Sequence, residues 1–116
     1  MLVTSHGTVE PTDVTDEEQA MAAVSEMGLH GLAMDMVGAE EDFHFHEFDT
    51  VLFVLSGKAA AEYPDGEMLE AVPGTLARVP AGTVHRDVPG VEYRGVFGFS
   101  IDPADMTQPI NKPASG

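Results

Sequence analysis

The segment HFHEFDT, residues 44–50, places two histidines at alternate positions. Successive side chains of a strand point to opposite faces, so His44 and His46 share one face while Phe43 and Phe45 share the other. Two imidazoles on one face suit a divalent transition metal, because neutral imidazole is a common ligand of such ions. Two polar residues on a solvent face, with two phenylalanines in the core, would give the same pattern. The pair alone is therefore weak evidence for a metal site.

A third histidine follows a turn in the segment GTLARVPAGTVHRD, residues 74–87. The segment predicts a strand that ends at Val79, and Pro80 and Gly82 then predict a turn. His85 comes shortly after this turn. Two segments, separated in the chain, thus each present histidine near a predicted strand.

Together the two segments resemble the sequence motifs of the cupin superfamily. The first motif, G-x5-H-x-H-x3-E-x6-G, is matched at four positions, which are Gly38, His44, His46 and Gly57. The second motif, G-x5-P-x-G-x2-H-x3-N, is also matched at four positions, which are Gly74, Pro80, Gly82 and His85. Sixteen residues separate Gly57 from Gly74, similar to the short spacers of compact bacterial cupins.

The resemblance implies an all-β fold, a single-domain antiparallel barrel or jelly roll of the RmlC-like type, with the motifs inside residues 38–88. It also implies that His44, His46 and His85 are metal ligands for Fe, Zn, Ni, Mn or Cu. The family's ligating Glu is replaced here by Thr50, and the closing Asn by Pro89, so no carboxylate ligand carries over. A metal-free cupin, in which the histidines are pocket residues, is the alternative.

Strand alternation sorts the residues that follow the histidines into two sets. Thr50, Leu52 and Val54 are expected to point into the pocket, and Val51, Phe53 and Leu55 to point outward. The same alternation turns Asp49 outward, while Glu47 lies in the turn, where it could reach the site. We expect water or substrate, and not either carboxylate, to complete the coordination of the metal.

The outward set is too apolar to stay exposed to water. Either a helix of the same chain or a second subunit must cover it. Small cupins resemble one another in forming homodimers through such faces, so we expect a homodimer, with helix cover as the alternative.

One segment predicts a helix, at about residues 16–27. Thr15 and Glu18 match a capping box, an apolar stripe follows at helical spacing, and Gly28 favours the end of the helix.

Beyond Gly28, short apolar runs are separated by Gly and Pro, which favours a sandwich or small barrel. The turn at residues 63–66, YPDG, predicts a hairpin of residues 58–63 and 67–72. The tail, residues 102–116, is expected to be extended.

The composition excludes some partners. The chain has 116 residues and a formal net charge of −15, and 12 of its 20 acidic residues precede the first cation, Lys58. Nucleic acid and anionic membranes require a basic surface, so neither is expected as a partner.

The start of the chain lacks the pattern of a signal peptide, no apolar run is long enough to span a membrane, and there is no cysteine. We therefore expect one cytoplasmic domain over residues 1–116.

The five cations include Arg78 and Arg94 near the second motif. An Arg inside a barrel could anchor a substrate carboxylate through two parallel hydrogen bonds. An Arg on a strand of an acidic protein is more often a surface ion-pair partner. The sequence does not fix which face either residue occupies.

The resemblance implies two classes of function. The first is a metalloenzyme that acts on a small organic molecule in the barrel pocket, with a dioxygenase-like, lyase, isomerase or cyclase activity. The second is a non-catalytic cupin that binds a small molecule or metal without turnover. A fold does not imply a function, and the only visible proton-transfer groups are Glu47, Asp49 and a water ligand. Of the two classes, we favour the enzyme.

Overall fold

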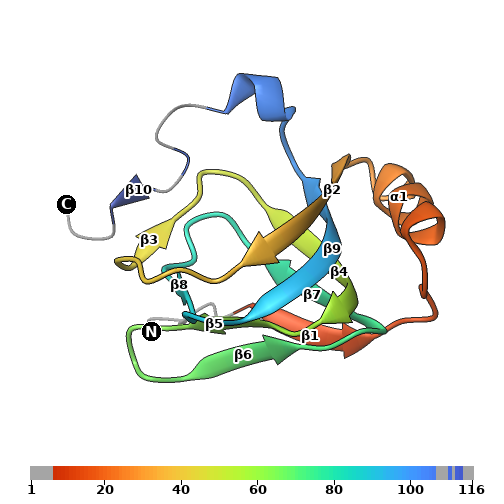
Figure 1. Cartoon of the computed structure of the whole chain (residues 1–116). Helices are drawn as coiled ribbons and strands as arrows, with labels where there is room; N and C mark the ends of the chain where they lie inside the picture. Colours follow the sequence, from red (N-terminus) through yellow and green to blue (C-terminus); the bar gives the residue numbers. More distant parts are fainter. Residues whose placement is uncertain (1–6, 107–109, 111, 114–116) are drawn as a thin grey trace.

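A computed structural model describes residues 7–106, 110 and 112–113 (Figure 1). Its strands are β1 (Thr8–Pro11), β2 (His30–Val37), β3 (His44–Phe45), β4 (Thr50–Gly57), β5 (Ala59–Glu62), β6 (Met68–Ala71), β7 (Thr75–Val79), β8 (Arg86–Asp87), β9 (Glu92–Phe99) and β10 (Lys112–Pro113). The helices are α1 (Glu17–Glu26) and the 3-10 turn η1 (Pro103–Asp105).

The strands form three antiparallel sheets. A five-stranded sheet has the order β1-β7-β4-β9-β2, a three-stranded sheet has the order β6-β5-β8, and β10 pairs with β3. Strand β4 lies in the middle of the large sheet, and its register shifts between Val54 and Ser56. The sheets curve around a common interior (Figure 1), so the expected all-β jelly roll is confirmed.

The predicted hairpin is present. Strands β5 and β6 pair from Ala59 opposite Ala71 to Glu62 opposite Met68. The Gly66 N–H donates to the Tyr63 carbonyl at 2.9 Å, and Gly66 has a φ of +90°, which glycine adopts without a Cβ penalty. The Pro-Asp-Gly pattern of the turn was therefore sufficient to place it.

Helix α1 begins one residue later than the sequence predicted. Asp16, not Thr15, is the N-cap, and its carboxylate accepts from the Gln19 N–H at 2.8 Å. The Gln19 side chain in turn accepts from the Thr15 N–H at 2.8 Å. The capping residues are thus Asp16 and Gln19, because the charged Asp16 acceptor outcompetes the neighbouring hydroxyl. The helix ends before Gly28, whose φ is +76°.

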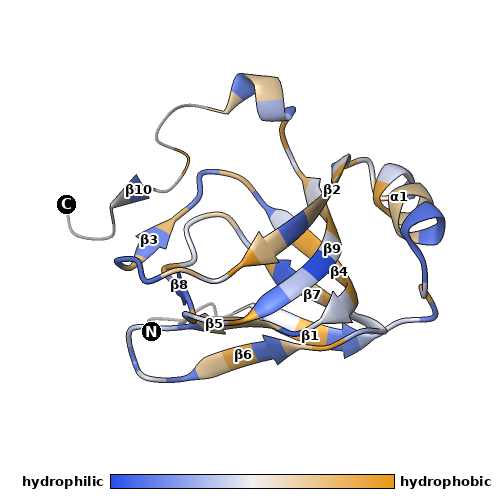
Figure 2. Cartoon of the chain, in the orientation of Figure 1, coloured by the Kyte–Doolittle hydropathy of each residue, from blue (hydrophilic) through white to orange (hydrophobic). Residues whose placement is uncertain are grey.

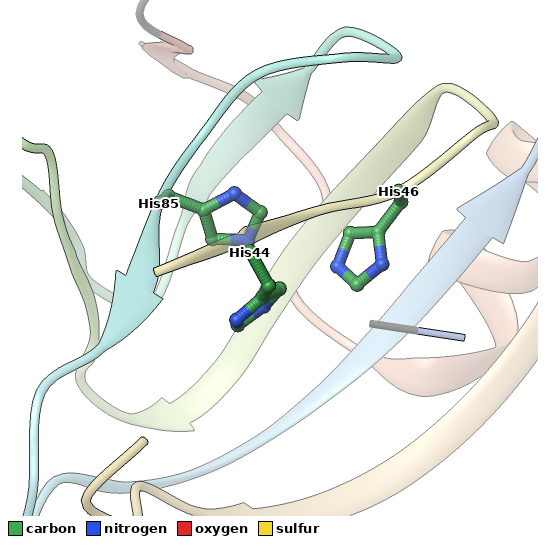
Figure 3. Close-up of side chains that lie close together, drawn as sticks. All are labelled: His44, His46 and His85. Carbon is green, nitrogen blue, oxygen red and sulfur yellow. The ribbon is translucent and has the colours of Figure 1, made fainter. Parts of the chain in front are cut away.

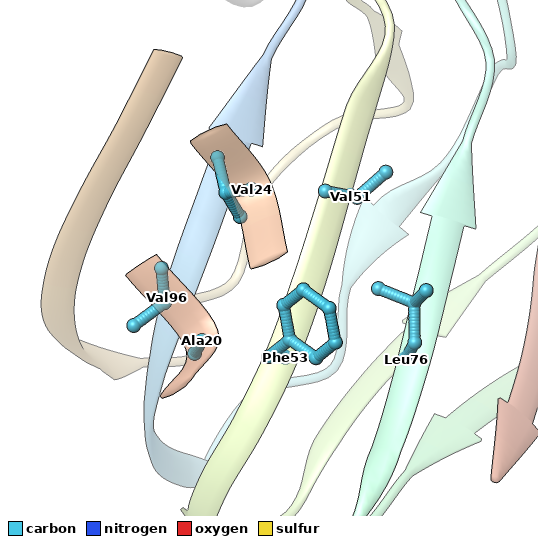
Figure 4. Packing of buried hydrophobic residues seen from close by; sticks show 6 residues of the cluster. All are labelled: Ala20, Val24, Val51, Phe53, Leu76 and Val96. Carbon is cyan, nitrogen blue, oxygen red and sulfur yellow. The ribbon is translucent and has the colours of Figure 1, made fainter. Parts of the chain in front are cut away.

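Alternation along β4 separates two hydrophobic clusters, as expected. Val51 and Phe53 point outward and pack in a cluster whose other buried members are Ala20, Val24, Leu76 and Val96 (Figure 4). Leu55 packs at the edge of this cluster. Leu52 and Val54 point inward and pack with Ala59, Ala71 and Ala77.

The helix of the same chain covers the outward face. Ala20 and Val24 of α1 are fully buried against β4 and β9, and Gly98 of β9 lies so close that a Cβ there would be 2.9 Å from Val24. Figure 2 shows that α1 carries hydrophilic and hydrophobic residues on the same short helix. Helix cover, one of the two alternatives, is therefore what shields Phe53, and the homodimer stays a prediction without support from this face.

The chain beyond β9 runs back over the motif region. Asp102 caps η1 by accepting from the Ala104 N–H at 2.9 Å, and Lys112 and Pro113 pair with Phe45 and His44 of β3. The rest of the expected extended tail, residues 107–109, 111 and 114–116, lies outside the described residues. Within the described part of the chain, no helix is long and apolar enough to span a membrane.

Candidate metal centre

Backbone hydrogen bonds bring the two histidine motifs together. The His44 N–H donates to the His85 carbonyl at 2.8 Å, and the His85 N–H donates back to the His44 carbonyl at 2.9 Å. The Gly82 N–H donates to the His46 carbonyl at 2.9 Å, so the turn of the second motif is tied to the first. This pairing is why segments about forty residues apart meet at one site.

The three histidines converge, as Figure 3 shows. One ring nitrogen of each of His44, His46 and His85 lies within 4.8 Å of the others. The ring centroids are 5.2 Å apart for His44 and His46, 4.7 Å for His44 and His85, and 5.2 Å for His46 and His85. Within the described residues, this is the group of His, Asp and Glu side chains with the geometry to hold a metal ion.

Each imidazole is held by a backbone carbonyl. Nδ1 of His44 lies 3.0 Å from the Asp42 carbonyl oxygen, and Nδ1 of His85 lies 2.9 Å from that of Thr83. Nδ1 of His46 lies 3.3 Å from the carbonyl oxygen of Ile110. A carbonyl only accepts, so each Nδ1 must carry the proton, which leaves each Nε2 with a free lone pair. Three such nitrogens fit a divalent transition metal, and the carbonyls are the kind of partner that orients ligating histidines.

Burial favours the neutral form of His46 and His85. The pKa of His46 is lowered to about 4, mainly by loss of hydration; the Ile110 hydrogen bond opposes this shift, and the neighbouring His85 and His44 add to it. The pKa of His85 is also lowered, first by burial and then by His44. Neutral imidazole is the metal-binding form, so no proton has to leave these two rings at pH 7 before an ion binds.

The histidines open into a cavity of about 750 Å³ inside the barrel. Most of its wall is apolar, with contributions from β2, β4, β5, β7 and β9 and from Met106 and Ile110 of the C-terminal segment. The volume is in the range of small-molecule sites. Of the pocket residues expected from β4, Thr50 and Leu52 line the cavity, whereas Val54 packs beneath it in the inner cluster.

Sequence reasoning missed two acidic residues of the cavity wall. Glu41 and Asp87 both line the cavity, and Glu41 Oε1 accepts from the Asp87 N–H at 2.8 Å. The same Glu41 oxygen lies 3.7 Å from His44 Nδ1. The pKa of Asp87 is raised, first by burial and then by the negative charge of Glu41. In the sequence, only the positions of Glu41 and Asp87 close to the motif histidines could have indicated that they line the site.

The arginines do not line the cavity. Arg78 Nε lies 3.0 Å from Glu10 Oε1, and both side chains are largely exposed. Arg94 pairs with Glu17 at 2.6 Å and with Asp35 at 3.1 Å on the outer side of the large sheet. Both therefore match the surface ion-pair interpretation, and neither is placed to anchor a substrate carboxylate.

The Asp49 carboxylate is hydrogen-bonded to the backbone and does not belong to the three-histidine group. Its carboxylate accepts from the Ala81 N–H at 2.8 Å, and its own N–H donates to the Ser100 hydroxyl at 2.9 Å. Glu47 lies beside a separate, smaller cavity lined also by Phe48 and Lys112. Neither carboxylate belongs to the three-histidine group.

Replacing Asp49 by alanine should therefore leave metal content unchanged. The loss of its hydrogen bond to Ala81 should loosen the turn of the second motif and lower the free energy of unfolding by about 1–2 kcal/mol. Elemental analysis and urea denaturation measure the two effects separately. A variant with markedly less metal but unchanged stability would make Asp49 a ligand.

Comparison with known proteins agrees with the two motifs. A family model for the cupin domain matches residues 31–87, which contain all three histidines. The chain belongs to the cupin superfamily. Among curated proteins, none matches this cupin significantly.

Several solved structures share the fold. Protein NMB1881 from Neisseria meningitidis is 26% identical, with a TM-score of 0.53, over 62% of this chain and 73% of that one. A DUF861 family protein from Thermotoga maritima is 16% identical, with a TM-score of 0.56, over 79% of this chain and 97% of that one. A cupin superfamily protein from Desulfitobacterium hafniense is 16% identical, with a TM-score of 0.50, over 88% and 84%. The last two likenesses support the cupin fold and nothing finer.

Proposed function

We propose that His44, His46 and His85 of this cupin bind one divalent transition metal, Fe, Zn, Ni, Mn or Cu, and that the protein is an enzyme for a small organic molecule. The observation that carries the proposal is the convergence of three imidazoles, each with Nδ1 held by a carbonyl, on a mostly apolar cavity. Three protein ligands leave coordination positions open, as in catalytic metal sites.

The residues of the chain would prepare the reaction in two ways. The carbonyls of Asp42, Thr83 and Ile110 fix the tautomer and orientation of the ligands. The apolar wall orients the substrate and excludes water, which strengthens electrostatic interactions inside. A divalent metal held by His44, His46 and His85 would supply Lewis-acid chemistry and, if redox-active, electron transfer. A dioxygenase-like, lyase, isomerase or cyclase reaction would fit this arrangement.

A screen for metal-dependent turnover tests the proposal. Tag-free protein, metal-free or loaded with one of the five metals, is incubated with 1,3-diketones, phenols and aryl amines, and products and oxygen uptake are recorded. We expect conversion of one class with one metal, and its loss in His85→Ala. Tight binding of a compound without turnover under every metal would favour the alternative, a non-catalytic binding module.

We also keep the homodimer as a proposal. Strand β2 is at an edge of the five-stranded sheet, and Val37 at its end is 64% exposed. An exposed apolar sheet edge favours pairing with another chain. Light scattering at micromolar concentration measures the mass in solution, and a monomer would rule the homodimer out.

A further inference from the structure

The charged side chains that line the cavity are all acidic. Among the described residues of its wall, Glu41 and Asp87 carry charge, and no Lys or Arg is present. A buried anion without a cation or donors nearby is unfavourable. The protein part of this cavity therefore supplies no Lys or Arg to neutralise a ligand carboxylate or phosphate, and its own two carboxylates repel one.

The described cations are engaged elsewhere. Lys58 pairs with Glu70 at 2.9 Å, and Arg86 pairs with Glu62 at 2.8 Å while its guanidinium lies 4.3 Å from the centre of the Phe43 ring. Arg78 and Arg94 form the outer ion pairs described above. Lys112 lines the small cavity next to Glu47. No described cation is placed to neutralise an anion in the main cavity.

The two carboxylates have acceptor capacity to spare. Glu41 receives the Asp87 N–H, and the Asp87 carboxylate has no hydrogen-bond donor in the part of the chain that the structure describes. A carboxylate accepts several hydrogen bonds, so this pair can take further donors from a ligand. Both residues are partly buried, which makes a charged donor more effective than at the surface.

An aromatic wall lies in the same cavity. Tyr93, Phe97 and Phe99 of β9 all line it, and the rings of Phe97 and Phe99 are stacked with centroids 5.9 Å apart. Glu41 and Asp87 line the same cavity as this wall, and burial and then the negative charge of Asp87 raise the pKa of Tyr93. Aromatic rings bind apolar ligand surface and also attract cations to their faces.

From the cavity wall we infer the class of ligand: an apolar, aromatic-sized molecule with a protonated amine and no negatively charged group. The ammonium donates to Glu41 and Asp87, the apolar body packs on Tyr93, Phe97 and Phe99, and the rest of the molecule faces the three histidines. This class of ligand would be the substrate of the proposed enzyme. Only the turnover of the ligand, and not its binding, rests on the proposed function. The charge preference itself comes from the protein and requires no metal.

Three probes with one skeleton test the inference. They are 2-(2-naphthyl)ethylamine, 2-(2-naphthyl)ethanol and 2-naphthylacetate, titrated calorimetrically into tag-free protein with and without zinc. In the metal-free protein the amine should bind about tenfold more tightly than the alcohol, the gain expected from one charge-assisted hydrogen bond. The acetate should bind more weakly than both. Equal binding by the three probes, or no measurable binding of the amine, would overturn the inference.

Paired variants locate the effect. Glu41→Gln combined with Asp87→Asn should remove the tenfold advantage of the amine over the alcohol and leave alcohol binding nearly unchanged. Asp13→Asn combined with Glu40→Gln removes the same charge from exposed positions and should keep the advantage. An equal loss in both pairs would assign the preference to the overall charge of the chain and contradict the inference. If the cavity variant does not fold, as judged by circular dichroism, the probe series on the unaltered protein decides.

The outcomes separate this inference from the proposed function. Amine preference in a protein that binds no metal would contradict the metalloenzyme and leave the ligand class intact. Metal-dependent turnover of an anionic compound would support the metalloenzyme and contradict the inferred ligand class.

Discussion

Replacing His85 by alanine is expected to lower the affinity for a divalent transition metal by about a hundredfold or more. Loss of a partner that only orients a ligand already costs about 10–100-fold, and loss of the ligand itself should cost at least the upper end of this range. His44→Ala and His46→Ala should behave alike, because the three rings lie at similar distances from one another. Competition with a chromophoric chelator measures the affinity.

The matched control for these variants is His30→Ala. His30 is exposed at the start of β2 and does not belong to the three-histidine group, so its loss should leave metal affinity unchanged. Full metal occupancy in His85→Ala would refute the assignment of the ligands.

Truncation of Phe53 is expected to give the largest loss of stability. Phe53 is 2% exposed and lies in the cluster between β4 and helix α1 (Figure 4). Removing a buried phenylalanine leaves a cavity as well as losing transfer free energy, so Phe53→Ala should lower the free energy of unfolding by about 3–5 kcal/mol. Urea denaturation measures this change.

Met68→Ala on β6 serves as the control for Phe53. Met68 is 49% exposed, so its truncation should change the free energy of unfolding by about 0.5 kcal/mol or less. A cost for Phe53→Ala no larger than that of the control would mean that α1 does not cover β4 in solution.

The sequence predicted the parts of the site that depend on local pattern. Motif spacing identified His44, His46 and His85, and strand alternation placed Leu52 inside the barrel and Phe53 outside it. Alternation tells which face of a strand is buried, but not what covers it. That is why the helix and a second subunit were both consistent with an apolar outward face on β4.

The parts that were missed depend on contacts between distant segments. Glu41 and Asp87 are two of 20 acidic residues, and only the fold shows that they share a cavity wall. The Ile110 carbonyl accepts a hydrogen bond from Nδ1–H of His46, which lies 64 residues away in the chain, and no local pattern predicts such a contact. The N-cap was displaced by one residue because Thr15 and Asp16 are both good caps.

The three-histidine metal centre can be tested by X-ray absorption spectroscopy of tag-free protein loaded with one equivalent of zinc. We expect one bound ion with three imidazole nitrogens at about 2.0–2.1 Å and water in the remaining coordination. The same measurement on His85→Ala should show fewer imidazoles or no bound zinc. Zinc that fails to bind to the unaltered protein, or binds with fewer than three imidazoles, would contradict a metal centre formed by His44, His46 and His85.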